Sequence, residues 1–250
     1  MGMRKGKFIY ATIYLMVLFA LSGCGGRLSV GARDDGKADV SLFMDTGKAA
    51  SRAIASIMAS LYPSGSGGQG AVFTQERADA LAKGLSGRDV ADVSAEALSP
   101  SVLSMKATLL EAALAATGEG ADGVLASLVH SEGNSLSISI TPEAMLGLYD
   151  SMDGDARGYM DLFMAPVFTG EPLTGGEYAA LIASVYGKDI AGEISTAVID
   201  FSLSAPKGKK LASCSSDDAV RSGRKASFSV PLLKLLTLDE ELSFGIGWEG

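Results

Sequence analysis

The stretch SLSISI, residues 135–140, gives the clearest strand pattern in the sequence, because leucine or isoleucine occupies every second position and serine the others. Such alternation is typical of a strand that buries one face. Thr141-Pro142-Glu143 follows directly, and a hydroxyl, a proline and an acid in this order are typical of a helix start. The sequence therefore switches from strand to helix at residue 141.

Similar patterns extend on both sides of this stretch. Alternation predicts further strands at 40–44, 89–97, 197–203, 226–230 and 242–248. Helical spacing and caps predict helices at 48–62, 74–85, 99–114, 142–150 and 174–186. Because strands and helices come in runs, we expect an α+β fold, with helices packed on a mostly antiparallel sheet. The fold should end in a C-terminal run of three strands, and the last two could pair with each other.

The composition excludes several classes of protein. Of 250 residues, 47% are apolar and 20% are charged, which rules out a collagen-like, disulfide-dense or fully disordered chain. Lys and Arg total 21 against 29 Asp and Glu, and so acidic a chain is a poor binder of polyanions. We therefore expect no nucleic-acid partner. One His and two Cys leave little for metal ligation, so no metal and no other cofactor is expected.

The N-terminus has the features of an export signal. Arg4, Lys5 and Lys7 precede the apolar run Phe8–Ala20, which is shorter than the roughly 20 residues that a helix needs to cross a bilayer. This order is typical of a secretory signal peptide. Leu21-Ser22-Gly23-Cys24 follows and resembles the lipobox of bacterial lipoproteins, a leucine and two small residues before a cysteine.

The resemblance implies that Cys24 is lipidated and becomes the first residue of the mature protein. In bacterial lipoproteins a diacylglycerol is attached to this thiol, the signal peptide is cut off before it, and the new amine is usually acylated, for example by palmitate. Two or three acyl chains hold a protein firmly on a membrane. In lipoproteins similar to the enteric ones, an Asp after the cysteine retains the protein in the inner membrane. Gly25 stands here, which favours the outer membrane, on its periplasmic or its surface face.

These features divide the chain into three parts. Residues 1–23 are the signal peptide, and residues 24–37, rich in glycine and charge, are expected to be a lipidated flexible tether with a reach of about 20 Å. Residues 38–250 are expected to form a single α+β domain, with two possible halves at 38–132 and 133–250. A chain that begins at Cys24 has 18 basic and 29 acidic residues, a net charge of −11.

Several motifs were tested for chemistry, and none predicts a catalytic site. Asp45-Thr46-Gly47 resembles the triplet of aspartic proteases, but that chemistry needs two carboxylates that share a proton, so Asp45 or Thr46 is better interpreted as a helix cap. Asp153 and Asp155 fall short of a calcium loop. His130 is the one histidine that could act as a base. With Cys24 acylated, Cys214 has no disulfide partner in the chain.

One basic segment could carry an interaction. Residues 205–225 contain six cations against two acids, and we expect a long loop that contacts an anionic surface such as lipid headgroups or a wall polymer. The candidate interaction residues are Lys207, Lys209, Lys210, Arg221, Arg224 and Lys225.

The sequence therefore predicts a membrane-anchored envelope lipoprotein with a non-catalytic binding or scaffolding domain. Its partners would be the membrane, through the lipid, and an envelope protein, anionic lipid or wall polymer. Two alternatives stay open, a carrier of lipid or a small apolar ligand among Met-rich helices, and a hydrolase whose nucleophile is not recognised.

Overall fold

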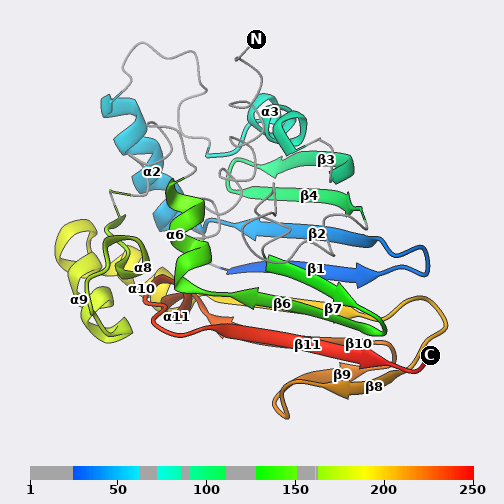
Figure 1. The fold of residues 1–250 in the computed structure, drawn as a ribbon. Coiled ribbons are helices and arrows are strands. Elements are labelled where there is room, and N and C mark those ends of the chain that lie inside the picture. Colours follow the sequence, from blue (N-terminus) through cyan, green and yellow to red (C-terminus); the bar gives the residue numbers. More distant parts are fainter. Residues whose placement is uncertain (1–24, 62–71, 86–89, 111–127, 151–160, 162) are drawn as a thin grey trace, which may run out of the picture.

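The computed structural model describes residues 25–61, 72–85, 90–110, 128–150, 161 and 163–250. These form a large sheet, a small sheet and several helices (Figure 1), so the predicted α+β class is confirmed. The strands are β1 (Gly25–Ala32), β2 (Ala38–Asp45), β3 (Val90–Ser99), β4 (Val102–Leu109), β5 (Val129–Glu132), β6 (Ser135–Ile140), β7 (Val198–Ser204), β8 (Leu211–Cys214), β9 (Val220–Ser222), β10 (Lys225–Pro231) and β11 (Leu242–Trp248). The helices are α2 (Lys48–Leu61), α3 (Gln75–Leu85), α6 (Pro142–Asp150), α8 (Pro166–Thr169), α9 (Gly175–Tyr186), α10 (Lys188–Thr196) and α11 (Leu232–Leu236).

The large sheet has the strand order β3-β4-β2-β1-β7-β10-β9. Within it β1 pairs antiparallel with β2 and parallel with β7, and the other ladders between its described strands are antiparallel. We call the end at which β1 begins the proximal end, where Gly25 lies opposite Asp45. The other end, where Ala32 lies opposite Ala38, is the distal end.

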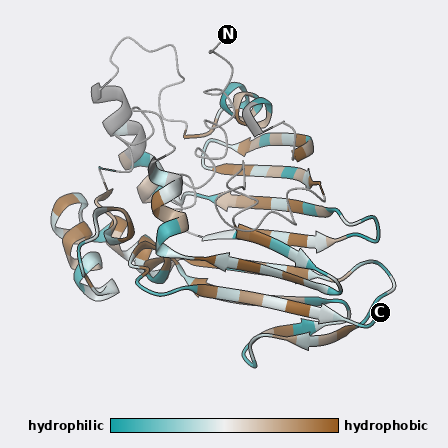
Figure 2. Ribbon diagram, in the orientation of Figure 1, coloured by the Kyte–Doolittle hydropathy of each residue, from teal (hydrophilic) through white to brown (hydrophobic). Residues whose placement is uncertain are grey.

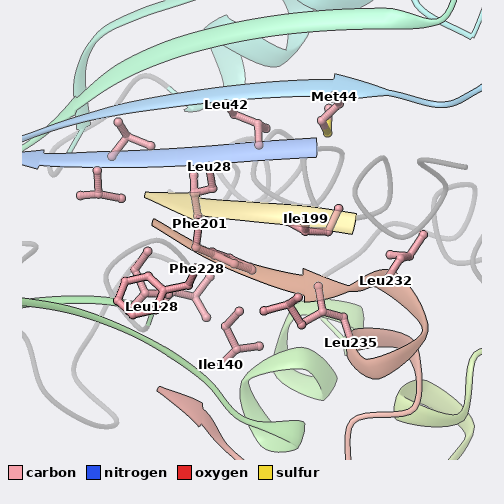
Figure 3. Close-up of a cluster of buried hydrophobic side chains, with 14 of the residues drawn as sticks. Leu28, Leu42, Met44, Leu128, Ile140, Ile199, Phe201, Phe228, Leu232 and Leu235 are labelled. Atoms are coloured by element: carbon pink, nitrogen blue, oxygen red, sulfur yellow. The ribbon is translucent and has the colours of Figure 1, made fainter. Parts of the chain in front are cut away.

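The small sheet, in the order β5-β6-β11-β8, covers one face of the large sheet. The ring of Phe244 on β11 stacks on Phe201 of β7 at 5.3 Å between centroids, and meets Phe228 of β10 at 4.9 Å. Figure 3 shows the buried side chains of these strands, with Leu28 beside Phe201 and Ile140 on the facing side. The core therefore lies between the two sheets, and the opposite face of the large sheet, its outer face, carries mostly polar side chains.

Three helices begin at the hydroxyl caps that the sequence predicts. The Thr74 hydroxyl accepts from Arg77 N at 3.3 Å, and the Thr141 hydroxyl accepts from Ala144 N at 3.0 Å. Thr174 forms a full capping box with Glu177. Each cap satisfies a backbone N–H at the helix start. Helix α10 contacts α2, α9 and α11, and Figure 1 shows α8 to α11 gathered near the proximal end of the sheet.

The prediction of a flexible tether at residues 24–37 is wrong. Residues 25–32 form β1 between two neighbouring strands, and of the described residues of this segment only 33–37 lie outside a strand. Leu28 and Val30 are buried at alternate positions, so the strand signal is present in the sequence. It is obscured because glycine and alanine occupy the other positions that face the core.

Two further expectations are wrong. The segment predicted as a helix at 99–114 contains the end of β3, a turn and β4. Leu103, Met105, Ala107 and Leu109 are all buried, which is a period of two. The helix was predicted because Leu103, Ala107, Leu110 and Leu114 fall at a helical spacing. The strands at 226–230 and 242–248 exist as β10 and β11 but do not pair with each other, since they belong to different sheets.

Candidate functional site

An open groove lies on the outer face of the large sheet at its distal end. It has a volume of about 800 Å³. Its floor comes from β1, β2 and β4, and its walls come from the β1–β2 turn, from β3 and from the segments that follow β7 and precede β10. The polar side chains that line it are Ser29, Arg33, Asp34, Asp35, Asp39, Ser41, Asp92, Lys106, Thr108, Ser204, Lys207 and Arg224.

A row of serines crosses the sheet at the groove, and two of them, Ser29 and Ser41, line the floor. Ser41, Ser29, Ser202 and Ser227 are consecutive cross-strand neighbours on β2, β1, β7 and β10. The Ser202 hydroxyl is buried without a hydrogen-bond partner in the described structure. Next to this row, a Cβ on Gly31 would lie 2.9 Å from Ser204 Oγ. A larger residue at Gly31 would therefore push into the space beside Ser204.

The β1–β2 turn is held by a network of ion pairs. Arg33 contacts Asp35 at 3.1 Å and Asp39 at 3.4 Å, and Lys37 contacts Asp35 at 3.3 Å. Partial desolvation of Asp35 acts to raise its pKa, but the hydrogen bonds from Lys37 and the charges of Arg33 and Lys37 outweigh it and hold the pKa below its ordinary value. The wall that this turn provides thus presents both signs of charge.

The other walls add charges from distant parts of the chain. Asp92 lies in an irregularity of β3 and has a φ of 52°, a conformation that non-glycine residues seldom adopt. The Arg224 guanidinium donates to the carbonyl of Ala205, which fixes this side chain beside Lys207 at the groove. Three strands and three connecting segments therefore bring together four basic and four acidic residues.

The prediction that residues 205–225 form one long loop is wrong. This segment contains two short strands, of which β8 pairs with β11 of the small sheet and β9 pairs with β10 of the large sheet. The segment therefore crosses from one sheet to the other and returns. A sequence rich in serine, with little alternation, gives no clear sign of these strands.

The six candidate cations of this segment are spread along it. Lys207 and Arg224 line the groove. Lys225 lies opposite Ser204, Arg221 belongs to the edge strand β9, and Lys209 and Lys210 precede β8. Counting the charges of residues 205–225 could not show that Asp34, Asp35, Asp39 and Asp92 line the same groove. Only the sheet register brings these residues to Lys207 and Arg224.

The Asp45–Gly47 triplet has a structural role. The Asp45 carboxylate accepts from Gly47 N at 3.0 Å, and the buried Thr46 hydroxyl lies 2.5 Å from Ser51 Oγ. Neither side chain caps α2, contrary to our expectation. Glu193 of α10 does so, because its two carboxylate oxygens accept from Ala49 N at 2.8 Å and Ala50 N at 3.0 Å.

The other candidate residues stand apart from the groove. Cys24, Asp153 and Asp155 lie outside the described residues. Cys214 is a free thiol, half-buried at the end of β8. His130 lies opposite Ser137 on the small sheet, and its Nδ1 atom is buried without a hydrogen-bond partner in the described part of the chain.

The described residues contain neither a cluster of metal ligands nor a membrane-spanning helix. There, three or more His, Cys, Asp or Glu residues nowhere gather as a metal would need, and none of the described helices is long and apolar enough to cross a membrane. Comparison with protein-family models, with curated proteins and with solved structures gave no match. The candidate site therefore rests on the geometry of the groove alone.

Proposed function

We propose that this protein is a membrane-anchored lipoprotein of the bacterial cell envelope, with its lipid on Cys24. The observation that carries the proposal is the position of Gly25. β1 is described from Gly25 onward, and the charged start, the apolar run and the lipobox all precede this residue in the sequence. Cleavage before Cys24 would therefore remove none of the described strand. A lipid on Cys24 would lie one residue from a central strand of the large sheet.

The proposed membrane is the outer one, since Gly25 stands where an Asp would favour the inner membrane by resemblance to enteric lipoproteins. Gly25 also has a structural reason to be glycine. Its φ is 130°, and a Cβ there would lie 2.8 Å from the carbonyl oxygen of Val198. The residue after the cysteine thus serves the fold, and the choice of membrane needs its own localisation experiment.

The proposed activity is non-catalytic binding or scaffolding through the groove. An open site with four basic and four acidic side chains suits a polar protein segment that carries both signs of charge better than it suits a polyanion, which the four carboxylates would repel. The proposed partner is therefore another envelope protein. Lys207 and Arg224 of the predicted cation set would take part in this contact.

The carrier and hydrolase alternatives have less support. A carrier of apolar ligands needs a cavity lined by apolar groups, whereas this groove is lined by charges and hydroxyls. Of the Met-rich set, Met145 is buried in the core, and Met152 and Met160 lie outside the described residues. A hydrolase with His130 as base would need a carboxylate or hydroxyl bonded to this imidazole, and Nδ1 accepts or donates no such bond in the described structure.

Fractionation of cells tests the anchor. The Cys24→Ala variant should appear in the soluble fraction or as an unprocessed precursor, while the parent and a matched Cys214→Ala variant stay with the membranes. A parent protein found in the soluble fraction would overturn the anchor.

A photo-crosslinking residue tests the groove. Placed at Lys106 in the floor, it should give a discrete adduct with an envelope protein in intact cells, and the same residue at the exposed Glu132 of β5 should not. An adduct with wall polymer, or equal labelling from both positions, would contradict the proposed partner.

A further inference from the structure

Exposed apolar side chains lie at the proximal end of the large sheet, those of Phe43, Val198 and Pro231 on its outer face and that of Leu98 at an irregularity of β3. Phe43 on β2 is 43% exposed, Leu98 near the end of β3 is 51% exposed, and Val198 at the start of β7 is 39% exposed. Pro231, opposite Val198 on β10, is also exposed. We call these four residues the proximal patch.

The patch contrasts with the rest of the outer face. Moving from Phe43 toward the distal end along β2, the outward positions are Ser41 and Asp39, and along β7 from Val198 they are Asp200, Ser202 and Ser204. On β2 and β7 the exposed apolar side chains are thus confined to the proximal end, whereas Val220 on the edge strand β9 lies opposite Ser227. Figure 2 shows hydrophilic colouring on the turns at the opposite, distal end of the strands.

The patch spans the region where the chain enters the domain. Leu98 and Val198 lie on strands separated by β4, β2 and β1, which places them on the order of 19 Å apart across the sheet. Gly25 lies between them, opposite Asp45. Because residues 25–32 are β1 and not a tether, the residue that would carry the lipid is bonded directly to the middle of this end of the sheet.

A cation lies beside the patch. Arg27, two residues after Gly25, is the cross-strand neighbour of Phe43, and its side chain is 64% exposed although it lies 3.9 Å from Asp200. Aromatic and aliphatic side chains next to an exposed arginine are typical of surfaces that rest in the headgroup region of a bilayer.

From these observations we infer that the proximal patch lies against the membrane that holds Cys24, with Phe43, Leu98 and Val198 at the boundary between headgroups and acyl chains. The inference rests on the proposed lipidation of Cys24 and adds an orientation to it. The groove lies at the other end of β1, and Gly25 to Gly31 spans about 20 Å of strand. The groove and the patch residues Phe43 and Val198 both lie on the outer face of the large sheet, so the groove would lie about 20 Å along this face from the membrane contact.

Quenching by labelled lipids tests this orientation in the mature lipidated protein. In a Cys214→Ser background, a fluorophore is attached to Val198→Cys or Leu98→Cys, and the matched control is Lys207→Cys at the distal end. The protein is reconstituted in phosphatidylethanolamine–phosphatidylglycerol vesicles that contain a lipid with a nitroxide headgroup. We expect at least threefold stronger quenching at 98 and 198 than at 207.

Two variants test whether the patch causes the contact. Phe43→Ser should lower the quenching at position 198 at least twofold. Val220→Ser, which removes a valine 72% exposed on β9, should leave it unchanged, and thermal unfolding confirms that both variants are folded.

The possible results distinguish a failure of the inferred orientation from a failure of the proposed lipid anchor. A protein that does not float with the vesicles, and whose N-terminus carries no lipid by mass spectrometry, overturns the anchor and the orientation together. A lipidated protein that floats with the vesicles but shows equal quenching at 98, 198 and 207 overturns only the orientation. Cross-linking between the proximal patches of two copies of the chain would show that a second copy covers positions 98 and 198. This result would also overturn the inferred membrane contact.

Discussion

Gly25 and Val198 are in contact across the parallel pair of β1 and β7. A Cβ on Gly25 would lie 2.8 Å from the Val198 carbonyl oxygen, and Gly25 has a φ of 130°. Gly25, the first described residue of β1, is thus fixed against a neighbouring strand. Because Cys24 is bonded to Gly25, a lipid on Cys24 would lie at the proximal end of the large sheet.

The Gly25→Ala variant should therefore be less stable by about 1–3 kcal/mol, because the substitution adds a clash to a backbone conformation that non-glycine residues seldom adopt. Gly176→Ala is the matched control. Gly176 lies in α9 without a neighbour within 4 Å of a built Cβ, so alanine there should leave stability unchanged or raise it. Urea unfolding of both variants checks this prediction, and equal stabilities would contradict it.

The Glu193→Ala variant tests the cap that Glu193 provides at the start of α2. The Glu193 carboxylate accepts from the backbone of Ala49 and Ala50, so Glu193→Ala should cost about 1–3 kcal/mol. Amide hydrogen exchange at residues 49 and 50 should also become faster. An exposed acid on the small sheet, Glu132, provides the control, and similar losses for Glu132→Ala and Glu193→Ala would show that the cap is not specific.

In the serine row beside the groove, one substitution should leave the free energy of unfolding unchanged or raise it, in contrast to the losses expected above. Ser202→Ala removes a buried hydroxyl that has no partner, so the free energy of unfolding should stay within about 0.5 kcal/mol of the parent or rise. Ser229→Ala on the next strand removes a 2.7 Å bond to Asp200 and should lower it by about 0.5–1.5 kcal/mol. A marked loss for Ser202→Ala would indicate that this hydroxyl has a partner in solution.

The capping box of α9 should make the stability of the fold depend on pH. Backbone and side-chain hydrogen bonds from Thr174 lower the pKa of Glu177, so this carboxylate stabilises the fold above its unfolded pKa, and the contribution is lost as the pH falls through the lower folded value. Thr174→Ala should cost about 1 kcal/mol at pH 7. The difference from the parent should shrink below about pH 4. A difference that stays constant between pH 7 and pH 3 would be inconsistent with this linkage.

The sequence predicted those elements whose signals are local. The caps at Thr74, Thr141 and Thr174 and the alternation at 135–140 are confirmed, because each depends on neighbouring residues. β4 was mistaken for a helix, since Leu103 and Ala107 also fall at a helical spacing with Leu110 and Leu114. β1 was mistaken for a tether, since glycines dilute its pattern.

The groove and the patch could not be predicted in this way. Asp39, Asp92 and Lys207 meet only through strand pairing between distant segments, and no local signal specifies that β7 lies parallel to β1. The same holds for the separation of β10 and β11 into two sheets. Strand register is a property of the whole fold, so sites that depend on it become visible only in the structure.

The central claim is that the mature chain begins at a lipidated Cys24 that is joined directly to β1. Mass spectrometry of the N-terminal peptide from the membrane-extracted protein tests this claim most directly. We expect a peptide that begins at Cys24, followed by Gly25, with the added mass of a diacylglycerol on the thiol. An unmodified Cys24, or a mature N-terminus at any other residue, would contradict it.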